Sequence, residues 1–277
     1  DRARVVLGQD ASLLAGDPQY PGAWQQSVDG CDAVINLAGE SVAGKRWDAR
    51  FKQIVHDSRV DGTAHVVAAI ESATARPSVL VSASGTDFYP WAEEIDHHTA
   101  CFEDDPVDES APPGSSYLAR VCRHWEEEAF RGSKLGVRVV AMRTGLVLGH
   151  GGALDRLALP FRLFAGGRIG SGQQWTSWIH LRDAVRGYLF ALDNPELSGP
   201  VNLVGPSNAR NSELARALGA ALSRPSWVPA PRFAVRVVVG EFADYVLHGR
   251  RAVPRKLETA GFEFELADLS AALADLY

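Results

Sequence analysis

The run AVINL at residues 33–37 indicates the fold class, because a short and nearly continuous apolar stretch suits a strand that is buried on both faces. Similar runs follow at 79–82 and 137–141, and another precedes it at 12–15. Between the runs, apolar side chains recur about every 3.6 residues. This helical spacing is carried by Phe51, Ile54, Val55, His65, Val66 and Ile70. The alternation predicts an α/β fold with a doubly wound parallel sheet and helices on its faces.

The pattern changes after about residue 150, where several glycines interrupt a mixed region. We assign residues 1–165 to the sheet domain, expect 175–204 to return to it, and assign 205–277 to a smaller, mainly helical C-terminal domain. Within that last part, the periodicity predicts helices at 211–222, 232–248 and 267–276.

Composition places the chain among ordinary globular proteins. Its 277 residues are 46% hydrophobic and 22% charged, which excludes collagen-like and disordered classes. A net charge of -6 argues against a nucleic-acid partner, since such proteins present a basic face. Residues 91–110 hold eight acids and no lysine or arginine, so we expect an exposed loop there.

Cysteine usage and hydropathy bear on location. Cys31, Cys101 and Cys122 are scattered without CxxC spacing, so the sequence predicts neither a disulfide framework nor a zinc knuckle. No apolar run reaches the roughly 18 residues that a spanning helix needs, and no signal peptide opens the chain. We therefore expect a cytoplasmic protein with no membrane partner. Because the chain begins with Asp1 and its one methionine is Met142, we also expect that something upstream was removed.

In a doubly wound sheet, ligands bind outside the carboxyl ends of the strands, so the residues after each apolar run are candidate site residues. The small residues of Asn36–Glu40 would let a ligand approach the backbone closely, although a tight turn explains them equally well. Ser82 and Ser84 end the next run, where a hydroxyl could bind a ligand oxygen or could simply cap a turn.

Seven stretches in this order resemble the NAD(P)-dependent epimerase/dehydratase group of the short-chain dehydrogenase/reductase superfamily, and more closely its "epimerase family" proteins with a helical C-terminal domain of unknown function. They are VINLAGESVAGKRW (34–47), DSRVDGT (57–63), LVSASGTDFY (80–89), YLARVCRHWE (117–126), RTGLVLG (143–149), GSGQQWTSWIHLRD (170–183) and GEFADYVLHGRRAVPRKLETAGFEF (240–264).

The resemblance implies a Rossmann-like fold that opens with a strand, a glycine-rich GxxGxxG turn and a helix, which hold the cofactor pyrophosphate. No stretch of the sequence matches this opening. Asp1 falls just after the position of the second family strand, so we expect that a βαβ opening of roughly 30 residues is missing from the sequence.

The resemblance also implies a nicotinamide cofactor, NADP or NAD, and positions for its contacts. Asp17 matches an acid that reaches the adenine edge, with a turn-initiating aspartate as the alternative. Arg2 and Arg4 lie near where a ribose 2′-phosphate would sit, which favours NADP slightly. The cofactor-binding candidates are Asp17, Leu37, Ala38, Gly39, Ser82, Arg143, Thr144 and Gly145.

The superfamily's catalytic triplet is Ser/Thr, Tyr and Lys. Ser84 matches the serine, and Tyr117 lies at or within one residue of the tyrosine position. Val121 stands where the lysine is expected, with Cys122 beside it. Since that lysine lowers a tyrosine pKa that is otherwise near 10, its replacement bears directly on proton transfer. Tyr89, in the loop after Ser84, is a second candidate acid/base or, more simply, an aromatic wall.

Substrate-side candidates lie in two loops. Lys45 and Arg46 follow Gly39, and Gln174 and Trp175 lie where relatives grip sugar-type substrates.

We expect structural roles for His180 and Asp183, with Asp183 as an acid near a helix N-terminus. His97, His98 and Cys101 match no metal-ligand spacing, so no metal is predicted.

Two functional hypotheses follow. The first is an NAD(P)-binding epimerase/dehydratase-like or reductase-like enzyme that acts on a small hydroxylated substrate, with a nucleotide sugar as one candidate. The second is a cofactor-binding module that has lost catalysis and acts as a redox sensor or scaffold, motivated by Val121. A homodimer is also left open, because relatives sometimes dimerise through two helices beside the active site.

Overall fold

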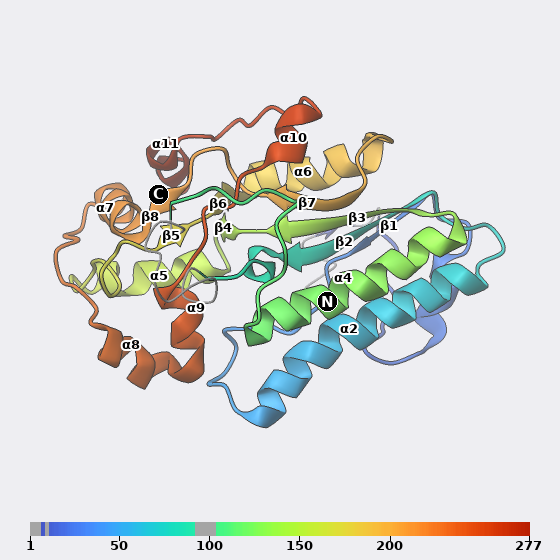
Figure 1. Cartoon of the computed structure of the whole chain (residues 1–277), viewed down its shortest axis with the longest axis horizontal. Helices are drawn as coiled ribbons and strands as arrows, with labels where there is room; N and C mark the ends of the chain where they lie inside the picture. The colour runs from blue at the N-terminus through green and yellow to red at the C-terminus, as the bar shows by residue number, and fades with distance from the viewer. Residues whose placement is uncertain (1–6, 9–10, 92–103) are drawn as a thin grey trace.

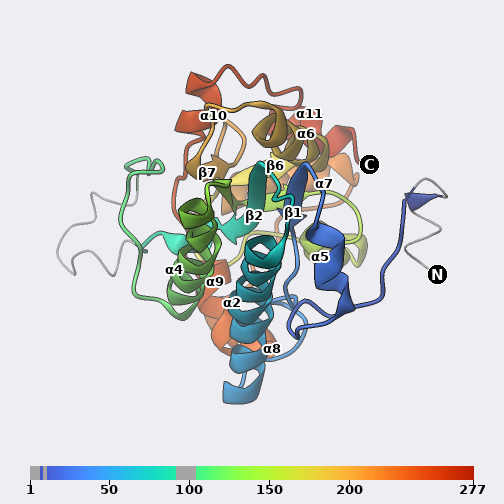
Figure 2. The same ribbon diagram turned by 90° about the vertical axis from the view of Figure 1, so that its right-hand side faces the viewer.

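A four-stranded parallel sheet forms the centre of the computed structural model, which describes residues 7–8, 11–91 and 104–277. The strand order is β1-β2-β3-β7, with bounds Ala33–Asn36, Val79–Gly85, Arg138–Thr144 and Gly199–Leu203. Helices α2 (Ala49–Ser72) and α4 (Tyr117–Phe130) cover one face, and α6 (Leu181–Asp193) covers the other (Figures 1 and 2). The predicted Rossmann-like α/β class is confirmed.

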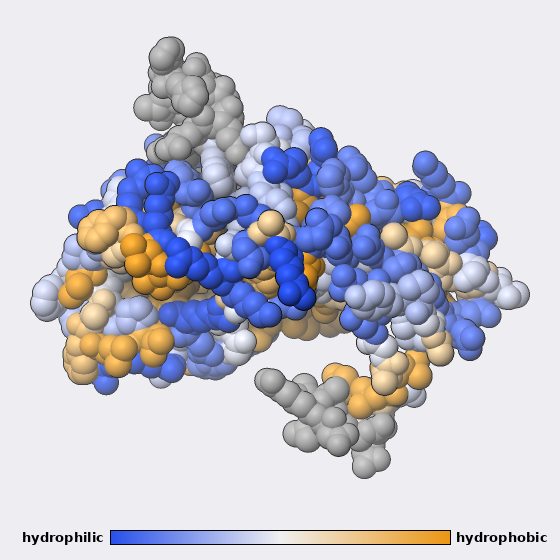
Figure 3. All heavy atoms as spheres, turned by 90° about the horizontal axis from the view of Figure 1, so that it is seen from below, coloured by the Kyte–Doolittle hydropathy of each residue, from blue (hydrophilic) through white to orange (hydrophobic). Residues whose placement is uncertain are grey.

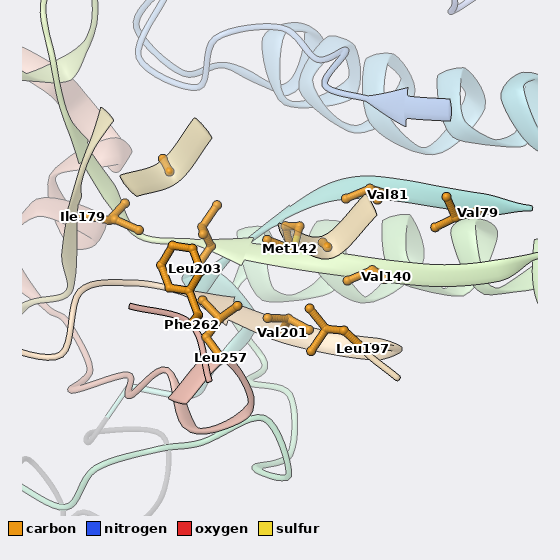
Figure 4. Packing of buried hydrophobic residues seen from close by; sticks show 12 residues of the cluster. Val79, Val81, Val140, Met142, Ile179, Leu197, Val201, Leu203, Leu257 and Phe262 are labelled. Carbon is orange, nitrogen blue, oxygen red and sulfur yellow. The ribbon is translucent and has the colours of Figure 1, made fainter. Parts of the chain in front are cut away.

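The sheet has a hydrophobic core on each face, since successive strand side chains point to opposite sides. Val81 and Met142 pack with Leu203 in the core on the α6 side (Figure 4). Leu80, between Val79 and Val81, packs instead with Ile70 of α2. Burial on both faces is why β2 and β3 are largely apolar without alternation, whereas Ile35 of the edge strand β1 is 41% exposed.

The two helices that flank the candidate site begin at conventional caps. Asp48 accepts a hydrogen bond from Phe51 N at the start of α2, and Ser116 accepts one from Ala119 N at the start of α4. Both N-termini lie at the carboxyl edge of the sheet, because each helix follows a parallel strand and runs back along it.

The C-terminal elements form a second packed region beside the sheet. Its core brings together β4, α5, α7 and α11, and β4 pairs in parallel with β6. The remaining bounds are η1 Ala23–Val28, η2 Thr86–Phe88, η4 Arg131–Leu135, β4 Leu146–Leu148, α5 Ala153–Arg162, β5 Trp175–Thr176, β6 Trp178–His180, β8 Ala209–Arg210, α7 Asn211–Ala221, α10 Arg255–Thr259 and α11 Leu269–Ala274.

Two predicted elements differ from the structure. The helix expected over 232–248 is divided into α8 (Arg232–Val239), η5 (Gly240–Phe242) and α9 (Ala243–Leu247), because Gly240 has φ of 64°, which a helix cannot contain. The strand expected at 12–15 is an exposed coil. Within the described part of the chain, β1 is the edge of the sheet and no strand pairs with this stretch.

Hydrophobic side chains also remain on the surface. Phe233, Val237 and Val238 of α8 are each at least two-thirds exposed. Figure 3 shows hydrophobic side chains at the left-hand end of the molecule, the end where Figure 1 places α8. None of the described helices is long and apolar enough to cross a bilayer.

Candidate functional site

The register of the sheet places three polar residues in one row at its carboxyl edge. Ser84 of β2 pairs with Arg143 of β3, and Arg143 pairs with Asn202 of β7. All three are at most 5% exposed. Buried polar side chains require hydrogen-bond partners, so the surrounding elements must supply them.

Helix α4 supplies the principal partner, Glu126. Its carboxylate accepts two hydrogen bonds from Arg143, from Nε and Nη2, each at 2.8 Å. It also accepts one from Ser84 Oγ at 2.7 Å. Burial alone would lower the pKa of Arg143, but the hydrogen bonds and charge of Glu126 outweigh it and raise that pKa. Ser84 therefore orients a buried ion pair, and its hydroxyl proton is donated to Glu126.

Tyr89 completes this network from the other side of Arg143. Its hydroxyl donates to Asn202 Oδ1 at 2.6 Å and accepts from Arg143 Nη1 at 3.0 Å. Tyr89 is only 1% exposed, and burial raises its pKa to about 12. The structure thus places Tyr89 in the core, close to Ser84 but not open to a ligand.

Tyr117 lies apart from Ser84, at the start of α4. Its hydroxyl donates to the carbonyl of Lys52 on α2. Its ring packs edge-on against Trp47, with centroids 5.4 Å apart, next to Tyr245 of α9. Burial raises the pKa of Tyr117 to about 12, whereas a proton-transferring tyrosine requires a lowered pKa. Its catalytic role stays a prediction.

A second polar cluster, absent from the sequence predictions, lies beside this network. Asp87 is in η2, directly after β2, and burial raises its pKa to about 6, against the opposing attraction of Arg59. Cys122 of α4 is buried, and burial raises the pKa of its thiol. A Cβ built on Gly85 would lie 3.6 Å from both Asp87 Oδ2 and Cys122 Sγ. Inspecting every titratable residue after β2 would have identified Asp87 from the sequence.

Arg59 of α2 joins this cluster to the turn after β1. Its Nη1 donates to the carbonyls of Glu40, at 2.9 Å, and Val55, at 3.1 Å. Burial lowers the pKa of Arg59, although the nearby acidic groups oppose that effect. A Cβ on Gly39 would lie only 3.1 Å from Arg59 Cζ, so the glycine leaves room for the guanidinium.

The remaining cofactor candidates of β1 and β2 differ in exposure. Leu37 is 63% exposed, while Ala38 N donates to Asn36 Oδ1 at 3.3 Å. Ser82 is 1% exposed, and its hydroxyl donates to the carbonyl of Ala83. Leu37, Ala38 and Gly39 thus form an accessible surface at the sheet edge, whereas Ser82 is enclosed within the sheet.

The loop after β3 lines an open pocket of about 350 Å³. Thr144 Oγ1 is hydrogen-bonded to the Met142 carbonyl, and a Cβ on Gly145 would lie 2.4 Å from the Ser177 carbonyl oxygen. Only glycine fits at position 145. The pocket is lined by Gly145, Leu146, Val147, Gly149, His150, Gly151, Gly152, Ala153 and Leu181. Glycine backbone on one wall lets a flat ligand approach closely.

The substrate candidates are divided between two places. Gln174 Nε2 donates to the carbonyls of Ile169 and Val246, each at 3.1 Å, so it ties its loop to α9. Trp175 is stacked under Arg210, whose Cζ is 3.9 Å from the ring centroid. Lys45 and Arg46 are exposed, and Arg46 lies against Gly240, on the C-terminal side.

The other sequence candidates have local structural contacts. Asp17 is exposed, and its Oδ1 accepts from Gln19 N, as in a turn. His180 Nδ1 accepts from Arg182 N at the start of α6, and Asp183 accepts from Leu266 N near the C-terminus.

Arg2, Arg4, His97, His98 and Cys101 lie outside the described residues. Elsewhere in the chain, the structure contains no group of three or more side chains that could hold a metal ion.

Comparison with known proteins identifies the family to which this chain belongs. The family model "NAD dependent epimerase/dehydratase family" matches residues 2–205. The chain belongs to this family. A second model, "Domain of unknown function (DUF1731)", matches residues 230–276.

Three relatives give the scale of the similarity. The chain is 43% identical over 253 residues to an Arabidopsis thaliana "Epimerase family protein SDR39U1 homolog, chloroplastic", covering 90% of this chain and 70% of that one. The crystal structure of human epimerase family protein SDR39U1 (isoform 2) with NADPH matches with a TM-score of 0.83 and 31% identity, covering 99% and 93%. A nucleoside-diphosphate sugar epimerase from Corynebacterium glutamicum matches with a TM-score of 0.71 and 30% identity, covering 93% and 48%.

The pocket of this epimerase/dehydratase family member leaves room for a flat ligand against its glycine backbone. A Cβ on Gly151 or Gly152 would meet nothing within 4 Å, so the backbone there is open to a ligand. The exposed Leu37 adds an apolar surface at the same edge. In the described ranges, no glycine-rich loop follows a strand in the way that a pyrophosphate site requires.

Proposed function

We propose that this chain is an NAD(P)-binding epimerase/dehydratase-like or reductase-like enzyme that acts on a small hydroxylated substrate. Nucleoside-diphosphate sugars are the first class to test, because the similar C. glutamicum protein is named as an epimerase of such sugars. The observation that carries the proposal is the glycine-walled pocket in the loop after β3, in a chain of this family.

The cofactor would supply a nicotinamide ring that takes or gives a hydride. In this chain, Gly145 and the glycines of the pocket would hold the nicotinamide side, and Leu37–Gly39 would lie beside the dinucleotide. Arg143 and Ser84 would act indirectly, because their buried ion-pair network fixes the ends of β2 and β3 under the ligand.

Cofactor preference, location and partners are parts of the same proposal. NADP is favoured over NAD, and the human relative was solved with NADPH. The cytoplasmic location stays a prediction, since the plant relative is named chloroplastic. A small-molecule substrate is proposed as the partner, and a homodimer also stays a prediction, whereas no nucleic acid or membrane partner is proposed.

The first test is a fluorescence titration of NADPH and NADH against this chain and, where the gene encodes residues before Asp1, against the longer form. Gly152→Leu should weaken binding at least tenfold, because the new side chain would fill the pocket. Ala75→Leu, at an exposed loop position, is the matched control and should leave binding unchanged. Failure of both forms to bind either cofactor at sub-millimolar concentrations would contradict the proposal.

The second candidate function is a cofactor-binding module without catalysis. It is favoured by the hydroxyls of Ser84, Tyr89 and Tyr117, all of which donate to groups within the protein. The two candidates separate when NAD(P)H turnover is measured with a panel of nucleoside-diphosphate sugars. Steady cofactor turnover with any of them excludes the module, whereas tight cofactor binding without turnover favours it.

A further inference from the structure

The candidate site needs a proton-transfer group, and the hydroxyls expected from the family pattern are engaged elsewhere. Ser84 donates to Glu126, and Tyr117 donates to the Lys52 carbonyl. Val121 and Cys122 occupy the part of α4 where the resemblance places a lysine, so no ammonium group is present there. Proton exchange with a substrate hydroxyl therefore requires another titratable group.

Asp87 is such a group, and its carboxylate is not hydrogen-bonded to any part of the chain that the structure describes. It lies three residues after Ser84, at the carboxyl end of β2, where ligands of a doubly wound sheet bind. Gly85 has no side chain, and the space above it is bordered by Asp87 Oδ2 and Cys122 Sγ. A half-buried carboxylate with unused acceptor positions is costly, and such groups concentrate at functional sites.

Arg59 gives this carboxylate a fixed cation. Its guanidinium is held by the carbonyls of Glu40 and Val55 and lies 5.2 Å from the Trp125 ring centroid. Because these contacts immobilise the arginine, its charge acts on Asp87 from one position. Arg59 thus places a positive charge near the Asp87 carboxyl and opposes the rise of its pKa, as the lysine of the family triplet lowers the pKa of the tyrosine.

We propose that Asp87 is the group that exchanges a proton with the substrate hydroxyl, with Arg59 as its positioning cation. The proposal deepens the proposed function and rests on it. With an oxidised nicotinamide bound to accept the hydride of the carbinol carbon, the Asp87 carboxylate would take the proton of the substrate hydroxyl as its O–H bond breaks and a C=O bond forms. In the reverse direction, the neutral acid returns the proton to the carbonyl oxygen.

The charged surroundings set the pH at which this exchange operates. Arg59 of α2 and Cys122 of α4 interact electrostatically with Asp87, and Tyr117 of α4 and Glu40 interact with Arg59. Burial raises the pKa of Asp87 more than Arg59 lowers it, to about 6. A base with this pKa is ionised at neutral pH and needs little driving force to accept a proton. Turnover in the oxidising direction should therefore fall below pH 6.

The first experiment measures turnover of the nucleoside-diphosphate sugar panel together with NADPH binding. Asp87→Asn should reduce kcat at least a hundredfold and leave the NADPH Kd within threefold, whereas Asp87→Glu should restore part of kcat with a shifted pH profile. Asp193→Asn is the matched control, since Asp193 is an exposed aspartate at the end of α6. Wild-type turnover by Asp87→Asn would overturn the proposal.

The second experiment needs no cofactor and titrates the Asp87 carboxyl by carbon-13 NMR in the free protein. The resonance should titrate near pH 6 in the wild type and move upward by at least half a unit in Arg59→Met, while Arg50→Lys, an exposed position on the same helix, should leave it unchanged. Titration near pH 4, or no response to Arg59→Met, would overturn the proposal even if cofactor binding is found. Absence of cofactor binding by wild type would overturn the proposed function separately.

Discussion

Two polar clusters lie next to each other at the carboxyl edge of the sheet and differ in how completely they are hydrogen-bonded. In the arginine network, formed by Ser84, Tyr89, Glu126, Arg143 and Asn202, every charged group has a partner at hydrogen-bond distance.

In the aspartate cluster, formed by Arg59, Asp87 and Cys122, the charge of Arg59 is what stabilises the Asp87 carboxylate among the residues at 7–8, 11–91 and 104–277. A satisfied network rigidifies a fold, whereas a half-satisfied carboxylate reduces stability and is retained where chemistry needs it.

The largest expected effect comes from breaking the arginine network. Glu126→Ala leaves the Arg143 guanidinium buried without a counterion, which should lower the free energy of unfolding by about 3–5 kcal/mol. Urea unfolding followed by circular dichroism measures it. Glu127→Ala is the control, because the Glu127 side chain is 62% exposed and its neighbour Arg123 is at the surface; it should change stability by less than about 0.5 kcal/mol.

A double variant sharpens the same point. Glu126→Leu combined with Arg143→Met removes both charges and should recover most of the stability that Glu126→Ala loses, since buried pairs contribute little net stability. Equal destabilisation in the double and single variants would show that Ser84 and Tyr89 depend on the charges themselves.

In the aspartate cluster, removing the charge should raise the free energy of unfolding at alkaline pH, whereas it lowers that free energy in the arginine network. The Asp87 pKa is about 6 in the folded protein, above the ordinary value of 3.8, so the folded state binds the proton more tightly. This contribution to stability is fully present below pH 3.8 and is lost as pH rises through 6.

Asp87→Asn should therefore stabilise the protein by about 1–3 kcal/mol at pH 8 and by almost nothing at pH 4. Thermal unfolding across this pH range measures the difference. Destabilisation by Asp87→Asn at pH 8 would mean that the folded protein stabilises the ionised Asp87 carboxylate. The two clusters would then both consist of satisfied charged groups.

A smaller effect is expected at Tyr117, which lies near the aspartate cluster but is fully hydrogen-bonded. Tyr117→Phe leaves the Lys52 carbonyl without its donor and should cost about 0.5–1.5 kcal/mol of unfolding free energy. The pH dependence of turnover should not change. A loss of kcat comparable to that of Asp87→Asn, with NADPH binding intact, would instead assign proton transfer to Tyr117.

The smallest effect on stability is expected outside both clusters, at Asp17. Asp17→Asn keeps the side-chain oxygen that accepts from Gln19 N and removes only an exposed charge, so unfolding should change by less than about 0.5 kcal/mol. NADPH titration of the same variant tests the predicted adenine contact. If Asp17 contacts the adenine, the variant should bind NADPH more weakly. An unchanged Kd would mean that Asp17 only stabilises its turn.

Several elements were predicted correctly because their signals are local. The apolar runs at 33–37, 79–82 and 137–141 overlap β1, β2 and β3. Burial on both faces explains the runs of β2 and β3, whereas β1 is an edge strand with Ile35 exposed. The predicted helix at 211–222 agrees with α7. The predicted strand at 12–15 was wrong because pairing depends on a neighbour, which no local signal reports.

The candidate site was predicted only in part. Sequence order identified Ser84, Arg143 and Tyr89 as residues of one edge, and the structure joins these three through Arg143. Tyr117 was expected beside Ser84, but at the start of α4 its side chain contacts Lys52 and Trp47 instead. Asp87 was overlooked, because an aspartate after a strand is unremarkable until its burial is known, together with the lack of a hydrogen bond to it from the part of the chain that the structure describes.

The sequence by itself determined the fold class, the family and the residues that follow each strand, because apolar periodicity and motif order are properties of the chain. Only the tertiary structure decided which of those polar groups are satisfied. The register of three strands and the position of Glu126 on α4 neutralise Arg143, while no donor among the described residues hydrogen-bonds to Asp87. Hydrogen bonding and desolvation depend on groups far apart in sequence, and these interactions separate a structural ion pair from a reactive carboxylate.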